Sequence, residues 1–137
     1  RGVKSAGIVE SIDVYPTLCE LCGFTPPAHL EGLSMKPLLD EPARPWKKAA
    51  FSQFPRPFLP SKAGAGMGYT MRTERYRYTE WRIPGQPLAV ELYDHEKDPF
   101  EMTNIAGLAE NAGAVAMLRK ALQQGWRGAL PAGMKKP

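Results

Sequence analysis

The sequence predicts an α+β fold, in which a small antiparallel sheet of about four strands is packed by a C-terminal helix. The clearest observation is the stretch 69–82, where β-branched and aromatic residues alternate with polar ones on both sides of a turn-prone 73–75. Residues 88–93 predict a further strand. Near the C-terminus, apolar residues recur at helical spacing and predict an amphipathic helix: Val115, Leu118, Leu122 and Trp126.

The composition is that of a single globular domain. The chain has 137 residues, of which 43% are hydrophobic and 23% are charged, so disorder along the whole chain is excluded. Eighteen Lys and Arg against fourteen Asp and Glu give a net charge of +4, with no run of like charges. No apolar stretch is long enough for a membrane span. The chain starts at Arg1 without Met, and we interpret it as part of a larger protein or a trimmed one.

The N-terminal third predicts few regular elements. Residues 3–10 favour a strand or an extended lead-in. A short helix follows, with Asp13 as its N-cap and Gly23 just beyond its end. Residues 24–48 are rich in proline and predict a connecting loop with one helical turn at 35–39.

Two further elements complete the predicted fold. Residues 50–54 predict a strand, and the helix near the C-terminus is expected over 109–122. Between them, the stretch 55–68 holds six Gly or Pro residues and little apolar content. We expect this stretch to be the most mobile internal loop, because it has little apolar content to anchor it, and long loops in compact domains are often functional.

The cysteines and histidines are better explained by structural roles than by redox chemistry or metal binding. Cys19 and Cys22 match C-x-x-C, but they lie at the C-terminal end of the predicted helix, where the helix dipole does not favour a thiolate. We expect a buried, non-redox pair, since free cysteines are often buried. His29 and His95 lack the spacing of a zinc finger and are expected to be exposed loop residues.

The acidic residues after the last predicted strand do not form a known calcium loop. Asp94, Glu96, Asp98 and Glu101 lack the glycine of the D-x-[DN]-x-[DN]-G pattern, and Pro99 interrupts it. We expect these four carboxylates to be solvated charges in a turn. Asp98 in front of Pro99 predicts a turn.

The predicted hairpin interleaves basic and aromatic residues, and two explanations stay open. Arg72, Trp81 and Arg82 are the candidate substrate-binding residues, because an arginine fork matches anionic oxygens and a tryptophan ring offers a flat face to a sugar. Strand alternation places Arg72 on the face opposite Tyr69 and Met71, which are expected to pack against the final helix. The structural alternative is ordinary cross-strand pairing, in which Arg72 holds a carbonyl or a carboxylate.

Four segments carry a resemblance to a known family. They are SIDVYPTLCELCG, EGLSMKPLL, MGYTMRTERYRYTEW and ELYDHEKDPFEMTNIA, in this order along most of the chain. Together they resemble the sulfatase family, and more narrowly the C-terminal part of its iduronate-sulfatase-like members. The Ser-Gln-Phe-Pro-Arg segment at 52–56 and the Met-Gly-Tyr segment at 67–69 favour that branch.

The resemblance implies a division of labour within a larger bacterial-type enzyme. Residues 1–48 would be the end of the large α/β sulfatase domain with a connecting loop, and 49–137 a C-terminal antiparallel-sheet subdomain. This subdomain would support the N-terminal sulfatase domain of the same chain and wall part of the pocket for a sulfated sugar. A periplasmic or secreted location is favoured for the parent protein.

The catalytic centre of the family has no match in this stretch. The C/S-x-P-S-R motif, whose Cys or Ser becomes formylglycine, does not occur, and the calcium-binding aspartates have no counterpart. Formylglycine and calcium are therefore expected in an N-terminal part, with no cofactor and no catalytic residue here. The alternative function is a non-catalytic module that binds sulfated or anionic glycans. Nucleic acid is disfavoured as a partner because +4 offers few phosphate contacts, and no membrane partner is expected.

Overall fold

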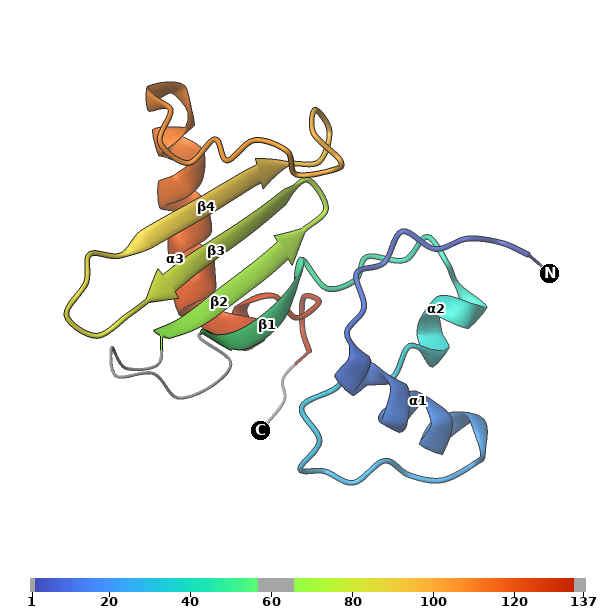
Figure 1. Cartoon of the computed structure of the whole chain (residues 1–137). Coiled ribbons are helices and arrows are strands. Elements are labelled where there is room, and N and C mark those ends of the chain that lie inside the picture. Colours follow the sequence, from blue (N-terminus) through green and yellow to red (C-terminus); the bar gives the residue numbers. More distant parts are fainter. Residues whose placement is uncertain (1, 57–65, 135–137) are drawn as a thin grey trace.

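The computed structural model describes residues 2–56 and 66–134 and confirms the predicted α+β fold (Figure 1). The sheet has the order β1-β2-β3-β4, and all neighbours are antiparallel. Its strands are β1 (Ala49–Arg56), β2 (Gly66–Thr73), β3 (Tyr76–Arg82) and β4 (Ala89–Asp94). The described helical elements are η1 (Ser11–Asp13), α1 (Val14–Leu21), α2 (Lys36–Asp40), η2 (Ala109–Asn111) and α3 (Ala112–Gly128).

The hydrophobic core lies between one face of the sheet and α3, which crosses behind the strands in Figure 1. The apolar side chains at alternate strand positions pack here, as the alternation predicts. The buried members of this core are Ala49, Met71, Tyr78, Leu92, Leu118 and Ala129. Within the described part of the chain, no helix covers the opposite face of the sheet, which is called the open face below.

The central hairpin forms as the sequence predicts, and β1 is longer than predicted. Residues 73–75 make the turn between β2 and β3, and Thr73 Oγ1 accepts a hydrogen bond from the backbone N–H of Tyr76 at 2.9 Å. Strand β1 pairs with β2 as far as Arg56, opposite Gly66. The expected loop over 55–68 is therefore wrong at both ends, where the chain is paired strand. Its remainder, 57–65, lies outside the described residues.

The N-terminal segment is an extended lead-in rather than a strand, and no strand is assigned over 2–10. It enters the turn η1, and α1 begins one residue after Asp13. Asp13 stands at the N-cap position as predicted, but its carboxylate makes no cap bond to the helix. The carboxylate instead serves a buried ion pair that joins distant segments.

That ion pair ties the N-terminal segment to the lead-in of β1. Lys47 Nζ donates to Asp13 Oδ1 at 2.7 Å and to Glu10 Oε2 at 2.7 Å. The side chains of Lys47 and Asp13 are almost fully buried. Glu10 Oε1 also accepts from the backbone N–H of Phe51, and Asp13 Oδ1 accepts from that of Leu33. The sheet and the segment before α1 are thus held together by charge-assisted hydrogen bonds.

Candidate functional site

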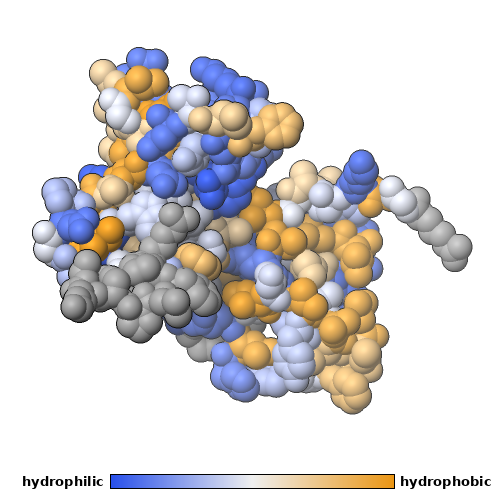
Figure 2. Space-filling model, in the orientation of Figure 1, coloured by the Kyte–Doolittle hydropathy of each residue, from blue (hydrophilic) through white to orange (hydrophobic). Residues whose placement is uncertain are grey.

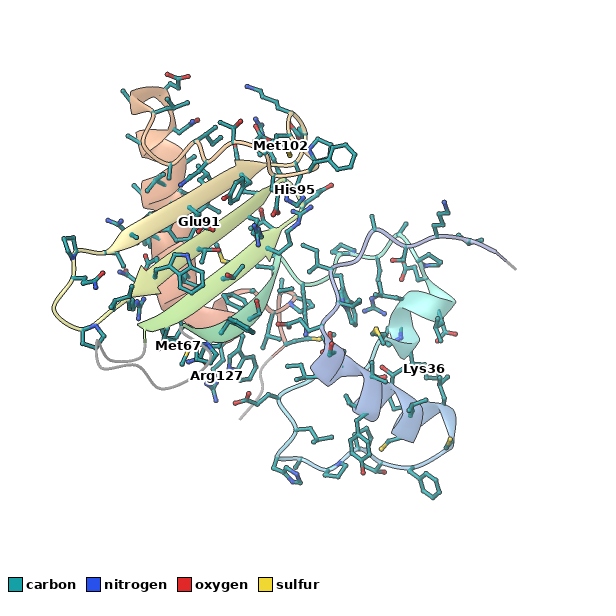
Figure 3. All side chains as sticks on the ribbon, in the orientation of Figure 1. Lys36, Met67, Glu91, His95, Met102 and Arg127 are labelled. Carbon is teal, nitrogen blue, oxygen red and sulfur yellow. The ribbon has the colours of Figure 1, made fainter. Side chains whose placement is uncertain are left out.

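The open face of the sheet is polar and aromatic. Register and alternation place six functional side chains on it: Thr70, Arg72, Arg77, Trp81, Glu91 and Tyr93. Figure 3 shows Glu91 on the strands in front of α3. Two of the three predicted candidates, Arg72 and Trp81, therefore share one face, and both are partly exposed.

Arg72 is held by the turn at the end of its own hairpin. Its Nη1 donates to the backbone carbonyl of Glu74 at 3.0 Å and also to that of Thr73. A longer bond of 3.5 Å reaches the carbonyl of Tyr76. These contacts match the structural alternative, in which the guanidinium satisfies carbonyls that a tight turn leaves without ladder partners.

Trp81 lies across the neighbouring strand at a position without a side chain. Residue 68 is opposite Trp81 in the register, and a Cβ on Gly68 would lie 2.6 Å from Cζ3 of the indole. The indole Nε1–H donates to Glu91 Oε1 at 2.9 Å, which fixes the orientation of the ring. Because Gly68 has no side chain, the indole of Trp81 can lie flat against the sheet, and Glu91 accepts the hydrogen bond from its N–H.

Arg82 lies on the other face of the sheet, on the side of α3. It pairs with Met67 in the register, and its guanidinium lies over the ring of Tyr69, 4.5 Å from the centroid. Its Nη2 donates to the buried carboxylate of Glu80 at 2.8 Å. One surface therefore does not present Arg82 together with Arg72 and Trp81.

A cleft of about 440 Å³ opens beside Arg72, between the N-terminal segment, the start of β1 and the end of β2. We call it the Arg72 cleft. Its polar lining includes Glu10, Ser11, Ser52 and Thr70. The volume is in the range of small-molecule sites. Sequence reasoning missed these residues, because single serines and threonines far apart in the chain carry no motif.

The remaining arginines of the hairpin have partners inside the sheet. Arg75 binds Asp94 with two parallel bonds, from Nε at 2.9 Å and from Nη2 at 2.7 Å. These bonds lower the pKa of Asp94 below its usual value and raise the pKa of Arg75. Arg77 lies over the ring of Tyr93 at 5.0 Å. This pattern favours cross-strand pairing for these arginines.

The expectation of solvated charges after β4 is wrong for Asp94 and Glu101. Asp94 is 5% exposed and paired with Arg75. The half-buried carboxylate of Glu101 contacts Arg77, and His95 Nε2 lies 2.6 Å from its Oε1. His95 is therefore not the freely exposed residue that was predicted, whereas His29 is exposed.

The turn at Asp98 is confirmed. The carboxylate of Asp98 accepts hydrogen bonds from the following backbone, among them the N–H of Thr103 at 2.9 Å. Backbone donors of Met102 and Thr103 lower the pKa of Asp98. Figure 3 shows His95 and Met102 on this same segment, at one end of the sheet.

The cysteine pair is not buried as predicted. Cys19 is half-buried, and Cys22 is exposed just after α1 ends. The reason is that α1 buries only Pro16 and Thr17 against the rest of the described chain. Over residues 2–56 and 66–134, no group of three or more His, Cys, Asp or Glu side chains is placed to hold a metal ion. No described helix has the length and apolar character needed to cross a membrane.

The rest of α1 presents apolar side chains to solvent. Figure 2 shows hydrophobic residues gathered over the α1 and α2 side of the molecule. The exposed members that we call the α1 patch are Ile12, Val14, Tyr15, Leu18, Leu21 and Phe24. An apolar patch of this kind is typical of an interaction surface rather than of a surface that faces solvent.

A four-stranded antiparallel sheet covered by a C-terminal helix stands next to the apolar helix α1, which the described residues leave uncovered. This arrangement is typical of a subdomain that packs against a larger fold. Residues 1–127 match the family described as "N-sulphoglucosamine sulphohydrolase, C-terminal". The chain belongs to this family of sulfatase C-terminal domains, as the resemblance in its sequence indicates.

Known relatives of the chain are sulfatases. It is 29% identical over 133 residues to N-acetylglucosamine-6-O-sulfatase of Bacteroides thetaiotaomicron, covering 90% of this chain and 22% of that protein. It is 33% identical over 102 residues to a Delta 4,5-hexuronate-2-O-sulfatase of the same organism, covering 70% of this chain and 19% of that protein. The chain thus spans about a fifth of the relatives that it matches.

A solved structure gives the same result for the fold. The structure of BT4656 in complex with its substrate D-glucosamine-2-N,6-O-disulfate superposes with a TM-score of 0.67 at 28% identity. The match covers 85% of this chain and 24% of that one, so the fold seen here is a subdomain of the larger fold.

Proposed function

We propose that this chain is the C-terminal module of a hydrolase that cleaves sulfate esters of a sulfated sugar. The observation that carries the proposal is the family match over 1–127, together with relatives named for sulfated glucosamine and hexuronate. The module supplies structural support and part of the pocket wall. In this proposal the formylglycine nucleophile and the calcium ion belong to the N-terminal domain, as the resemblance to the sulfatase family implies.

The α1 patch supports an N-terminal sulfatase domain as the partner. The apolar side chains of α1 have no cover in the described residues, and the relatives are about five times longer than the matched stretch. Burying this patch against the N-terminal domain would remove apolar surface from water. We place residues 1–48 with that domain and 49–137 in the C-terminal subdomain.

For substrate contact we propose the Arg72 cleft and the indole of Trp81, which lie on the same face. The cleft offers hydroxyls of Ser52 and Thr70 beside a guanidinium, a combination suited to an anionic sugar. The iduronate-like preference, in which the sugar carries a carboxylate, is part of the proposal. Arg82, on the helix face at the end of β3, would take part only if the substrate reached around the ends of the strands.

The test is a kinetic comparison in the full-length parent enzyme. Arg72→Ala and Trp81→Leu should each raise KM for a uronate-containing sulfated sugar by about tenfold, while a small aryl sulfate is hydrolysed almost as before. Lys120→Ala, an exposed change on α3, is the matched control and should alter neither substrate. If both substrates suffer equally and the melting temperature falls, Arg72 only holds the turn and the pocket-wall role is refuted.

A further inference from the structure

The loop that follows β4, residues 98–103, projects two large apolar side chains into solvent. Phe100 is 84% exposed and Met102 is 81% exposed, more than any other large apolar side chain of the described residues. Figure 3 shows Met102 at one end of the sheet. A single apolar side chain on a surface is ordinary, but two on one short loop form a patch, and exposed apolar patches are typical of interaction sites.

Hydrogen bonds fix the backbone of this loop. The N–H of Asp98 donates to the carbonyl of Asp94 at 2.7 Å, and the N–H of Glu101 donates to the carbonyl of Asp98 at 3.2 Å. The carboxylate of Asp98 also accepts from the N–H of Thr103 at 2.9 Å. The two apolar side chains are therefore presented by a loop of defined conformation, which loses little conformational freedom when it binds.

Glu101 lies between the two apolar residues in a strained conformation. Its φ is 56°, and among the described residues no other residue except glycine has a positive φ. Its carboxylate contacts Arg77, and His95 Nε2 lies 2.6 Å from its Oε1. These contacts hold Glu101 against the sheet, whereas its neighbours on both sides stay in solvent. Backbone strain persists where surrounding contacts impose it, and it is common in segments that bind a ligand or partner.

The loop lies at the end of the sheet that adjoins the segment before β1. The N–H of His95 donates to the carbonyl of Arg75 at 2.8 Å and joins the chain just before the loop to the turn between β2 and β3. Glu74, in the same turn, lines a pocket together with residues of 3–8 and 42–48. Figure 1 shows the loop after β4 and the start of the chain on the same side of the molecule.

We propose that Phe100 and Met102 insert into an apolar recess of the N-terminal domain of the parent protein. That domain is the occupant because residues 1–48, which the proposed division assigns to it, adjoin the end of the sheet where the loop lies. The matched stretch covers only 22% of the N-acetylglucosamine-6-O-sulfatase relative, so most of such a protein lies outside this chain. The α1 patch belongs to residues 1–48, whereas the loop belongs to the C-terminal subdomain itself. The contact at the loop therefore fixes how the open face, with Arg72 and Trp81, is turned toward the substrate.

The test compares how fast hydrogen peroxide converts Met102 to the sulfoxide in this chain and in the full-length parent, with mass spectrometry of peptides as the readout. Docking should slow the oxidation of Met102 in the parent at least about tenfold. Met117, which is exposed on α3, is the matched comparison, and its rates in the two proteins should agree within about twofold. Equal rates for Met102 in the two proteins, or protection of Met117 as large as that of Met102, would overturn the proposal.

A second copy of the chain is the competing occupant. Raising the concentration of the isolated chain about a hundredfold should leave the oxidation rate of Met102 unchanged, because self-association is the only contact that depends on this concentration. Protection of Met102 that appears as the isolated chain associates would assign the loop to a contact between copies and refute the N-terminal domain as the occupant.

Variants test the same contact without oxidation. Phe100→Ser combined with Met102→Ser should lower the melting temperature of the parent, because the contact loses both apolar anchors. The same change should leave the isolated chain within about 2 °C of the wild type, because both side chains are already in solvent there. Leu88→Ser combined with Met117→Ser, two exposed positions elsewhere, is the control and should alter neither protein. An unchanged parent, or an equal loss in the isolated chain, would refute the docking role.

This inference rests on the proposed division of the chain but not on sulfatase activity, and the two can fail separately. A parent that protects Met102 but hydrolyses no sulfate ester refutes the proposed function and leaves the docking role supported. An active parent in which Met102 is oxidised as fast as in the isolated chain refutes the docking role alone.

Discussion

At the end of β4, single carboxylates are stabilised in their charged form by donors that the fold brings to them. Asp94 accepts two bonds from Arg75, and Asp98 accepts from the backbone of the turn that follows. Both contacts lower the pKa of the carboxyl group. A carboxyl group whose pKa is lower in the folded state stabilises the fold at neutral pH and stops doing so in acid.

Asp94→Asn should reveal this dependence. The variant should have a lower free energy of unfolding than the wild type at pH 7, because Arg75 loses its charged partner. The difference should persist above the ordinary aspartate pKa of about 4 and shrink as the pH falls through the lowered folded-state value. Urea unfolding at a series of pH values measures it. Asp40→Asn, on an exposed helix pair, should show little effect at any pH, and a pH-independent loss in Asp94→Asn would contradict the assignment.

Among the elements, the contact between the N-terminal segment and β1 depends on a buried cation. Lys47 neutralises Asp13 and Glu10, which precede α1, and Glu10 in turn accepts from the first part of β1. Few apolar contacts join α1 to the sheet. The ion pairs therefore link these elements, and Glu10, one of their carboxylates, also lines the Arg72 cleft.

Lys47→Met tests this link. Removing the ammonium leaves two carboxylates buried without a cation, which should cost about 3–5 kcal/mol in the free energy of unfolding. Lys48→Met, the exposed neighbour, should cost less than about 0.5 kcal/mol. Urea unfolding followed by circular dichroism gives both values. Equal losses in the two variants would show that the buried ion pairs do not hold the elements together.

At the scale of the whole molecule, the two apolar surfaces differ in whether another described element covers them. The helix face of the sheet is closed by α3 over a buried core, whereas the α1 patch is apolar and uncovered. The chain spans about a fifth of its relatives, and the nucleophile motif of the family is absent from its sequence. Catalysis by this polypeptide alone is therefore not expected.

The purified chain should hydrolyse no aryl sulfate above background, with calcium present in the assay. The physical reason is that no residue here can become formylglycine, since neither Cys19 nor Cys22 stands in C/S-x-P-S-R. A chromogenic aryl sulfate gives the measurement, and the full-length parent is the positive control. Turnover that survives purification and disappears when a residue of this chain is changed would refute the prediction.

The sequence by itself determined the sheet, the hairpin and the C-terminal helix. Alternation and helical spacing are local patterns. They show which face of a strand or helix is apolar, and that face packs in the core. The resemblance to sulfatases could also be recognised from four sequence segments, and the family match confirms it. The sequence placed Arg72 on the face opposite Met71, which the register bears out.

Only the tertiary structure decided which polar groups meet. Lys47 finds Asp13 across 34 positions, and Arg75 finds Asp94 across 19, so no spacing rule could pair them. The exposure of Cys22 depended on which side of α1 packs against the rest of the described chain. The Arg72 cleft could not be predicted either, because residues 9–12, which form one of its walls, are not in a strand and have no period from which the direction of a side chain could be read.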